Sequence, residues 1–323
     1  GGGSGCVKRF PPPFDIIELL EKEFGKTVAY EPAFNDEFID HSFMNPGKAV
    51  ENAAMCDVNI VFAGTGARVE VEASDRRSMK LSYIQQRTII DTAKANPNTV
   101  VVLFAGSPID MSDWINDVAA VLYVGFPGEK GGEAIVNVLT GKVNPCGKLT
   151  ETFPVRYEDT PAYNGYIDSK ITKYEEELDV GYRYYDRNKI PVAFPFGFGL
   201  SYSTFNYSDL RLNAHDNVLT VAFSVENASD IDGKEISEIF IKAKSSHVYR
   251  PVKELKGFAK TFIIGGEKKR VEIKIDIREL KYWSVARDEW AIEDGIYEIL
   301  VASSAEDIRL SDKIRICDGK FII

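Results

Sequence analysis

The stretch VNIVFAG, residues 58–64, is apolar at nearly every position. A strand that is apolar on both faces is typical of a parallel sheet with helices on either side. Similar runs occur at 100–105 and 119–125, and a shorter one, TVAY at 27–30, predicts a further strand. The alternation predicts an α/β sandwich domain with a mainly parallel sheet over residues 1–155. Its helices are expected at 14–24, 46–55, 83–95 and after the glycine pair 131–132.

A different rhythm begins near residue 206. In LTVAFSVEN (219–227) and RVEIKIDI (270–277), apolar and polar residues alternate, which indicates strands with one buried face. Turn residues separate such runs, so residues 206–323 are expected to form an antiparallel β-sandwich. Between the two domains, residues 156–205 are rich in Tyr, Pro and Gly and are too apolar for a disordered linker. We expect this aromatic connector to pack along both domains.

The overall composition excludes several classes of protein. The chain has 49 Asp and Glu against 39 Lys and Arg and no long basic run, so no nucleic-acid partner is expected. An apolar run of about 18 residues is also missing, and we expect neither a membrane span nor a signal peptide. The four cysteines are widely separated in the sequence, and their spacing matches neither a zinc site nor a disulfide framework. They fit a reducing compartment, and a cytoplasmic location is expected.

The stretch ARVEVEASDRRSMK, residues 67–80, follows the first apolar run directly and carries three carboxylates and three arginines. In open α/β sheets, ligands bind outside the carboxyl ends of the strands, where this loop is expected to lie. Its position leaves two interpretations open. One is an exposed charged loop held by an Asp75–Arg76 ion pair, and the other is a site where Glu70, Glu72 or Asp75 transfers a proton.

Segments along the whole chain resemble, in the same order, the C-terminal two domains of glycoside hydrolase family 3, the exo-acting β-glucosidases and β-xylosidases. VEASDRRSMKL (71–81) resembles the family's E-G-x-D-R-x-x-M-x-L segment, and ANPNTVVVLFAGSPIDM (95–111) is close to a near-diagnostic family stretch. Further similar segments are GGGSG (1–5), GFPGEKGGEAIVNVLTGKVNPCGKLTETFP (125–154), GYRYYD (181–186), FPFGFGLSYSTF (194–205), PVKELKGFAK (251–260) and WAIEDGIYEILVASS (290–304). The resemblance implies that the sandwich at 206–323 is fibronectin III-like.

The resemblance also implies part of a retaining exo-β-glycosidase, with β-glucosidase as the expected activity. Such enzymes use two carboxyl groups about 5–5.5 Å apart, one as nucleophile and one as acid/base. The family's acid/base glutamate corresponds to Glu72, with Glu70 as the second choice. Asp75 and Arg76 correspond to the D-R of the motif and are expected to support the loop close to the substrate. Ala73 departs from the motif, because the family usually has a glycine there, which permits a positive φ.

The nucleophile is expected to be absent from this chain. The family carries it as the aspartate of an S-D-W motif in an N-terminal (β/α)8 barrel, and no stretch here has eight strand–helix repeats. SDW does occur at 112–114, but in the wrong domain, so Asp113 is interpreted as part of a helix N-cap. A barrel on another chain, or on a cleaved fragment, would then supply the nucleophile and the strand that precedes GGGSG.

Other functions remain open from the sequence. One is a non-catalytic carbohydrate-binding or interaction module, although Trp283 and Trp290 are expected in the sandwich core rather than as sugar platforms. Another is a phosphate-binding α/β protein, although GGGSG and GTGAR (64–68) lack the GK[ST] ending of a phosphate loop. The three histidines are widely dispersed, so neither a metal nor another cofactor is expected. The sugar specificity is undetermined, and assembly into a higher oligomer is a further alternative.

Overall fold

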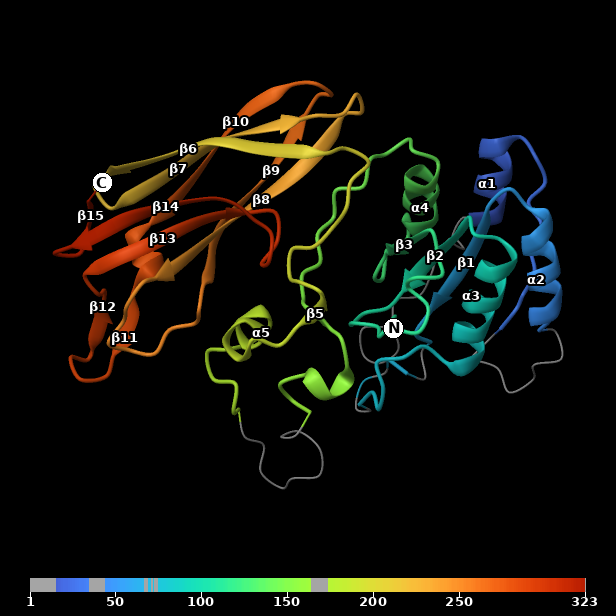
Figure 1. Cartoon of the computed structure of the whole chain (residues 1–323), viewed down its shortest axis with the longest axis horizontal. Coiled ribbons are helices and arrows are strands. Elements are labelled where there is room, and N and C mark those ends of the chain that lie inside the picture. Colours follow the sequence, from blue (N-terminus) through green and yellow to red (C-terminus); the bar gives the residue numbers. More distant parts are fainter. Residues whose placement is uncertain are drawn as a thin grey trace. The chain divides into compact units, whose positions relative to one another are not determined.

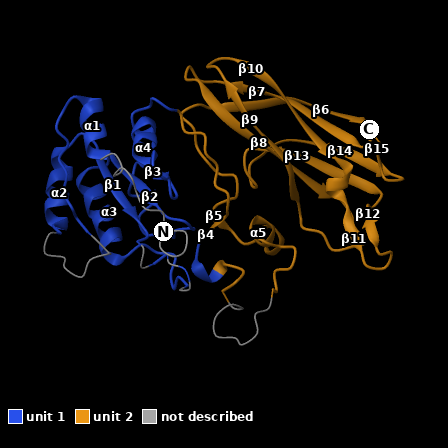
Figure 2. Ribbon diagram, turned by 180° about the vertical axis from the view of Figure 1, so that it is seen from behind, with its two compact units in different colours: residues 1–143, 155–158 blue, residues 144–154, 159–323 orange. Residues whose placement is uncertain are grey.

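The computed structural model describes residues 16–34, 44–66, 69–70, 72, 75–163 and 174–322. These residues belong to two units, one made of 1–143 and 155–158 and the other of 144–154 and 159–323 (Figure 2). Most of the described connector therefore lies within the second unit. The domain limits expected at 155 and 205 remain a prediction.

The apolar runs of the first unit form one parallel sheet in the order β1-β2-β3 (Figure 1). Its strands are β1 (Asn59–Gly64), β2 (Thr99–Phe104) and β3 (Ala120–Tyr123). In the central strand, Val101, Val102 and Leu103 have no solvent exposure, as expected of a strand that is covered on both faces. The predicted α/β class is confirmed.

Four helices accompany this sheet, namely α1 (Ile16–Phe24), α2 (Pro46–Met55), α3 (Tyr83–Ala95) and α4 (Gly131–Leu139). Helix α2 packs against α3, which also contacts β1 and β2, whereas α1 packs against α4 (Figure 1). Local sequence sets where two of them begin. Asn45 accepts a hydrogen bond from the N–H of Lys48 ahead of α2, and Ser82 accepts one from the N–H of Gln85 ahead of α3.

The strand predicted at TVAY (27–30) is wrong. Residues 27–34 have no regular secondary structure, and Tyr30 is 64% exposed. The backbone N–H of Val28 donates to Glu21 Oε1 in α1 at 3.1 Å instead of joining a sheet. A single strand is not stable without a neighbour to pair with, and no described strand pairs with this segment.

The second unit is an antiparallel β-sandwich. One sheet has the order β15-β14-β13-β8-β9 and the other β10-β7-β6 (Figure 1). Along β7, Leu219, Val221, Phe223 and Val225 alternate inward without solvent exposure, which confirms the period-two pattern. The strand bounds are β6 Phe205–His215, β7 Val218–Asn227, β8 Gly233–Ala243, β9 Glu254–Ile263, β10 Lys268–Asp276, β13 Gly295–Ala302, β14 Ile308–Cys317 and β15 Lys320–Ile322.

The described part of the connector packs onto the sandwich through its aromatic residues. Tyr182, in α5 (Tyr182–Asn188), has its ring centroid 5.2 Å from that of Phe196 and 5.5 Å from that of Phe240 in β8. Two short strands, β4 (Phe153–Pro154) and β5 (Val192–Phe194), pair with each other. Two 3-10 turns lie at Tyr157–Asp159 and Ile277–Leu280.

The core positions expected for Trp283 and Trp290 are wrong. They lie on a separate hairpin of β11 (Tyr282–Ser284) and β12 (Glu289–Ala291), directly opposite each other. Their rings meet edge to face with centroids 5.7 Å apart, and the residues are 47% and 61% exposed. The hairpin is a two-stranded sheet of its own, and its two tryptophans form a directly opposed cross-strand pair outside the sandwich core.

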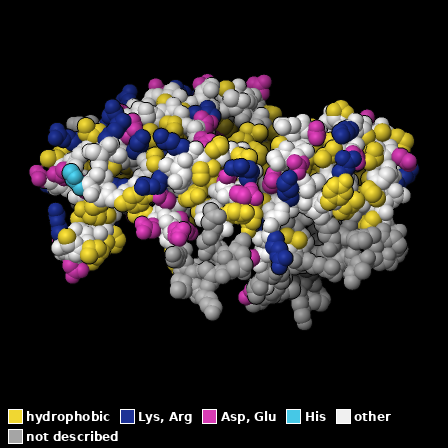
Figure 3. Space-filling model, turned by 60° about the horizontal axis from the view of Figure 1, so that its bottom comes forward, with side chains coloured by type: hydrophobic (Ala, Val, Ile, Leu, Met, Phe, Trp, Pro, Cys, Tyr) yellow, Lys and Arg dark blue, Asp and Glu magenta, His cyan; other side chains and the backbone are white. Residues whose placement is uncertain are grey.

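The surface carries both signs of charge. On the face shown in Figure 3, the basic and acidic side chains are interspersed, without the continuous basic patch that a phosphate backbone requires. Part of this mixture is paired along helices, as in Lys48–Glu51 of α2 and Arg87–Asp91 of α3. Among the helices of the described ranges, none has the length and apolar character to span a bilayer.

Candidate active site

The loop after β1 lies at the carboxyl edge of the parallel sheet and is joined there to the loop after β2. Of the residues predicted for this site, Glu70, Glu72, Asp75 and Arg76 are described, whereas Ala73 lies outside the described residues. The structure places these four residues in two different environments. Glu70 and Arg76 are largely buried, and Glu72 and Asp75 are exposed.

Glu70 ties its loop to the loop after β2. Its Oε2 accepts a hydrogen bond from the N–H of Gly106 at 2.9 Å, and its Oε1 accepts one from Ser107 Oγ at 3.0 Å. Arg76 Nη1 lies 3.5 Å from the same Oε1, and the Glu70 side chain is only 13% exposed. Hydrogen bonds to an ionised group are roughly twice as strong as neutral ones. The carboxylate therefore acts as a clasp between two segments that are 36 residues apart in sequence.

Arg76 completes this clasp from the same loop. Its Nη1 donates to Ser107 Oγ at 2.5 Å and to the carbonyl oxygen of Pro108 at 3.2 Å. The hydroxyl of Tyr157 donates to the carbonyl oxygen of Arg76 at 3.4 Å. Both ends of the described loop segment are thus attached to neighbouring backbone, one through Glu70 and the other through Arg76.

Gly106 allows the close approach on which the clasp depends. A Cβ at this position would lie 2.5 Å from Cε2 of Phe126 and 3.0 Å from Oε2 of Glu70. Any larger residue would displace one of them, because real Cβ contacts are not this short. The segment FAGSP (104–108) therefore contributes the N–H of Gly106 and the hydroxyl of Ser107 to the site, and the missing side chain of Gly106 allows Glu70 to approach. Its likeness to a family stretch was visible in the sequence, but the roles of Gly106 and Ser107 were not.

Glu72 lies two residues beyond the clasp and is exposed. Two carboxylates of the same loop thus have different surroundings, since Glu70 is largely buried and Glu72 is exposed. Both oxygens of Glu70 already accept hydrogen bonds from the protein. A general acid must reach the atom that it protonates, and Glu72 differs from Glu70 in being exposed to solvent.

Asp113, the aspartate of the SDW sequence, belongs to a surface ion pair. Its Oδ2 accepts a hydrogen bond from Lys80 Nζ at 2.5 Å, and this bond raises the pKa of Lys80. The helix expected to begin here is wrong, because residues 112–117 form consecutive turns. Asp110 supplies the local cap by accepting hydrogen bonds from the N–H and the hydroxyl of Ser112. Trp114, next in the chain, is 1% exposed.

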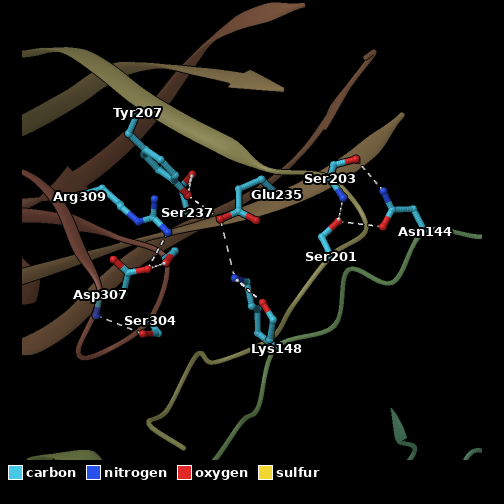
Figure 4. A network of polar contacts seen from close by, with 12 residues as sticks. Asn144, Lys148, Ser201, Ser203, Tyr207, Glu235, Ser237, Ser304, Asp307 and Arg309 are labelled. Atoms are coloured by element: carbon cyan, nitrogen blue, oxygen red, sulfur yellow. Dashed lines mark hydrogen bonds and ion pairs between the residues drawn. The ribbon is translucent and has the colours of Figure 1, made fainter. Parts of the chain in front are cut away.

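A second polar cluster lies within the β-sandwich unit (Figure 4). Tyr207 donates a hydrogen bond to Glu235 at 2.8 Å, and Lys148 Nζ lies 3.7 Å from the same carboxylate. Burial is the main cause that raises the pKa of Tyr207. Lys148 also donates to the carbonyl oxygen of Gly199. These contacts attach the segment around Lys148 and the 195–204 segment to the sandwich, and no sequence pattern predicts them because the partners are distant along the chain.

Glu238 of β8 is a buried carboxylate of a different kind. It is 4% exposed, burial raises its pKa to about 7, and its Oε2 has no hydrogen-bond partner within the described part of the chain. Gly197 lies against this carboxylate with a φ of +81°. A Cβ added to Gly197 would lie only 2.5 Å from Oε2 of Glu238, so a larger residue would clash with it. No pattern in the sequence marks Glu238, which lies in an ordinary strand.

Two family descriptions match the chain. Residues 1–202 match the glycosyl hydrolase family 3 C-terminal domain, and residues 235–305 match a fibronectin type III-like domain. Among curated relatives, thermostable beta-glucosidase B of Acetivibrio thermocellus is 39% identical, over 97% of this chain and 42% of the relative. A putative beta-glucosidase of Schizosaccharomyces pombe is 37% identical, over 82% of this chain and 32% of the relative.

Solved structures agree with these matches. The GH3 beta-glucosidase of Bifidobacterium adolescentis superposes with a TM-score of 0.87 at 33% identity, covering 93% of this chain and 45% of that one. The beta-glucosidase of Kluyveromyces marxianus in complex with glucose gives 0.79 at 35% identity, covering 84% and 32%. The chain thus spans less than half the length of these relatives. It belongs to glycosyl hydrolase family 3 and corresponds to the C-terminal portion of the family's beta-glucosidases.

Proposed function

We propose that this chain supplies the acid/base loop of a retaining exo-β-glycosidase that acts on β-glucosides, while a (β/α)8-barrel polypeptide supplies the nucleophile. The observation that carries the proposal is the clasp of Glu70 and Arg76, which holds the loop at the carboxyl edge of the sheet and leaves Glu72 exposed. The names of the relatives support the substrate class, since they are beta-glucosidases.

In the proposed reaction, Glu72 acts twice. The nucleophile attacks the anomeric carbon and forms a covalent glycosyl intermediate while the Glu72 carboxylic acid gives its proton to the leaving oxygen. Glu72 then removes a proton from the water that attacks the same carbon, which releases the sugar and restores both carboxyl groups. The role of Glu70 and Arg76 is to fix the position of the loop, because a general acid needs an accurate approach to its acceptor atom.

The test uses the full chain together with the N-terminal portion of the Acetivibrio thermocellus relative, ending where its match to this chain begins. We expect aryl β-glucosides to be hydrolysed by the pair. With Glu72→Gln, kcat should fall about 10²–10⁴-fold for poor leaving groups and much less for activated ones, which need no protonation. An equal loss for every leaving group, or full activity without Glu72, would contradict the assignment.

A second candidate function is a non-catalytic carbohydrate-binding module, favoured by the exposed Trp283–Trp290 pair. Exposed tryptophans present a large apolar face beside a polar edge. This function predicts that the chain alone binds soluble β-glucan in affinity electrophoresis and that Trp290→Ala abolishes the retardation. Unchanged mobility of the unsubstituted chain in the glucan gel would exclude it.

A further inference from the structure

A cavity of about 420 Å³ lies within the β-sandwich unit, where β6 and β8 begin. Two parts of the chain form its walls. The 195–204 segment contributes Pro195, Phe198 and Leu200, and the sandwich contributes residues of β8, of β14 and of the segment between β13 and β14. The exposed fraction ranges from 6% at Glu235 to 76% at Leu200, so the cavity reaches from the interior to solvent. Its volume lies within the range of pockets that bind small molecules.

The two cations that line this cavity are paired with carboxylates of the same wall. Lys148 Nζ lies 3.7 Å from Oε1 of Glu235, and Arg309 Nη2 lies 2.7 Å from Oδ2 of Asp307. The side chains of Lys148 and Glu235 are only 12% and 7% exposed, and Figure 4 shows them pointing toward each other. A further carboxylate, that of Glu306, belongs to an exposed residue. A ligand with a net charge would disturb these pairs, which is costly where charges are buried.

The same groups have unused hydrogen-bonding capacity. Oε1 of Glu235 accepts from Tyr207, whereas its Oε2 has no partner among the residues that the structure describes. Within those residues Arg309 donates from Nη2 alone, so its Nε and Nη1 are unused. Lys148 Nζ makes one described hydrogen bond, to the carbonyl oxygen of Gly199 at 3.3 Å, whereas an ammonium group has three donors. The cavity therefore offers acceptors and donors side by side, without an unbalanced buried charge.

We propose that this cavity binds a neutral polyhydroxyl compound of about one or two pyranose rings, a size that suits the lower part of the range for small-molecule pockets. A hydroxyl group both donates and accepts, so neighbouring hydroxyls of one ring can donate to Glu235 and accept from Lys148 or Arg309. The C–H groups on the faces of the ring suit the apolar side chains of Phe198 and Leu200. The cavity uses no residue of the acid/base loop, so its ligand is independent of the proposed function.

A nuclear magnetic resonance titration of the full chain tests the proposal, with cellobiose as the probe and inorganic phosphate as the charged comparison. Gly199 and Ser304 lie on the two walls of the cavity. We expect cellobiose to shift their amide signals in a saturable way and phosphate to leave both unchanged. Saturable shifts with phosphate and none with cellobiose would overturn the proposal, as would the lack of saturable shifts with either compound.

Substituting both members of the buried ion pair removes its charges without leaving one of them unpaired. Lys148→Met combined with Glu235→Gln should bind cellobiose at least about tenfold more weakly, because hydrogen bonds to ionised groups are the strongest that such a ligand can make. The matched control is Lys244→Met with Glu298→Gln, a more exposed pair near the other end of β8. Arg309→Gln changes a side chain that is 39% exposed, leaves the interior intact and should weaken binding about threefold or more. Binding equal to that of the control in both cavity variants would overturn the proposal.

Two more variants separate this cavity from the other surfaces proposed to bind sugars. Trp290→Ala changes the exposed hairpin, and Glu72→Gln changes the acid/base loop. In both variants cellobiose should still shift the amide signals of Gly199 and Ser304. If Trp290→Ala abolishes these shifts, the hairpin holds the sugar and the proposed cavity site is wrong. If the shifts persist but no aryl glucoside is hydrolysed together with the barrel portion, the cavity site stands and the proposed function fails.

Discussion

Glu70 in the α/β unit and Glu238 in the β-sandwich unit are both carboxylates with little access to water, but their surroundings differ. Glu70 accepts hydrogen bonds from a backbone amide and a hydroxyl beside a guanidinium group. Glu238 has one oxygen without any described partner, and burial raises its pKa to about 7. A buried carboxylate stabilises a fold when donors meet it and destabilises it when they do not. A buried glutamate is thus expected to stabilise the first unit and to destabilise the second.

The largest expected effect comes from substituting Gly197, the residue that lies against the Glu238 carboxylate. Gly197→Ala should lower the free energy of unfolding of the second unit by about 3 kcal/mol, as the sum of a positive φ, which costs about 1–2 kcal/mol, and a clash with the carboxylate, about 1–3 kcal/mol. Urea titration measures it. Gly266→Ala is the matched control, because Gly266 also has a positive φ but open space around its Cβ position.

The clash component can be separated from the backbone component. Truncation in Glu238→Ala removes the atoms that the new methyl group would meet, so the double variant should be more stable than the sum of the two single effects. If Gly197→Ala and Gly266→Ala cost the same, Gly197 is needed for its backbone conformation alone, and Glu238 is not confined by it.

Glu238→Gln is expected to stabilise the second unit in a pH-dependent way. The pKa of Glu238 rises from 4.5 to about 7 on folding, so folding is progressively penalised as the pH rises between these values. The penalty is complete above pH 7 and absent below 4.5. The variant should therefore gain about 2–3 kcal/mol at pH 8 and nothing at pH 4. An equal gain at both pH values would mean that ionisation of Glu238 is not the cause.

Glu70→Gln should weaken the clasp with a smaller effect. One oxygen can still accept a hydrogen bond, but the charge that faces Arg76 is lost, so the first unit should lose about 1–2 kcal/mol. Limited proteolysis should cut the 65–80 loop sooner. Glu72→Gln is the control, since an exposed substitution is expected to change stability by no more than about 0.5 kcal/mol. Equal proteolysis of both variants would contradict the clasp.

The smallest effect is expected for the exposed ion pair of Lys80 and Asp113. Lys80→Met removes a short contact, but both side chains are largely in water, and such pairs contribute about 0–1 kcal/mol. We expect a change below about 0.5 kcal/mol that decreases further in high salt. A loss as large as that of Glu70→Gln would show that exposure does not distinguish the two ion pairs.

Much of the fold follows from hydrophobic periodicity. The run at 58–64 and the alternation at 219–227 each predict a strand that the structure contains, because burial of apolar side chains dominates there. The run at 27–30 has a similar composition but is not a strand, since a strand also requires a neighbour that local sequence does not reveal. Trp283 and Trp290 are exposed for a related reason, because hydrophobic character does not specify which surface covers a side chain.

The candidate site was less predictable from the sequence than the fold. The motif around Glu72 identifies the loop, but the clasp depends on Gly106 and Ser107, which the fold brings to Glu70 from 36–37 residues away. Glu238 has no local signal, because its environment is created by Gly197 from another segment. Pairings between distant segments decide which carboxylates are buried, and neither composition nor periodicity encodes these pairings directly.

The placement of the three tryptophans gives each unit its own optical signal. Trp114 is buried in the first unit, so its fluorescence should shift to the red when that unit unfolds. Trp283 and Trp290 meet edge to face at 5.7 Å, close enough for their excited states to couple and produce a circular dichroism couplet that vanishes when the hairpin opens. Unfolding of the two units can therefore be followed separately in one sample, without any attached label.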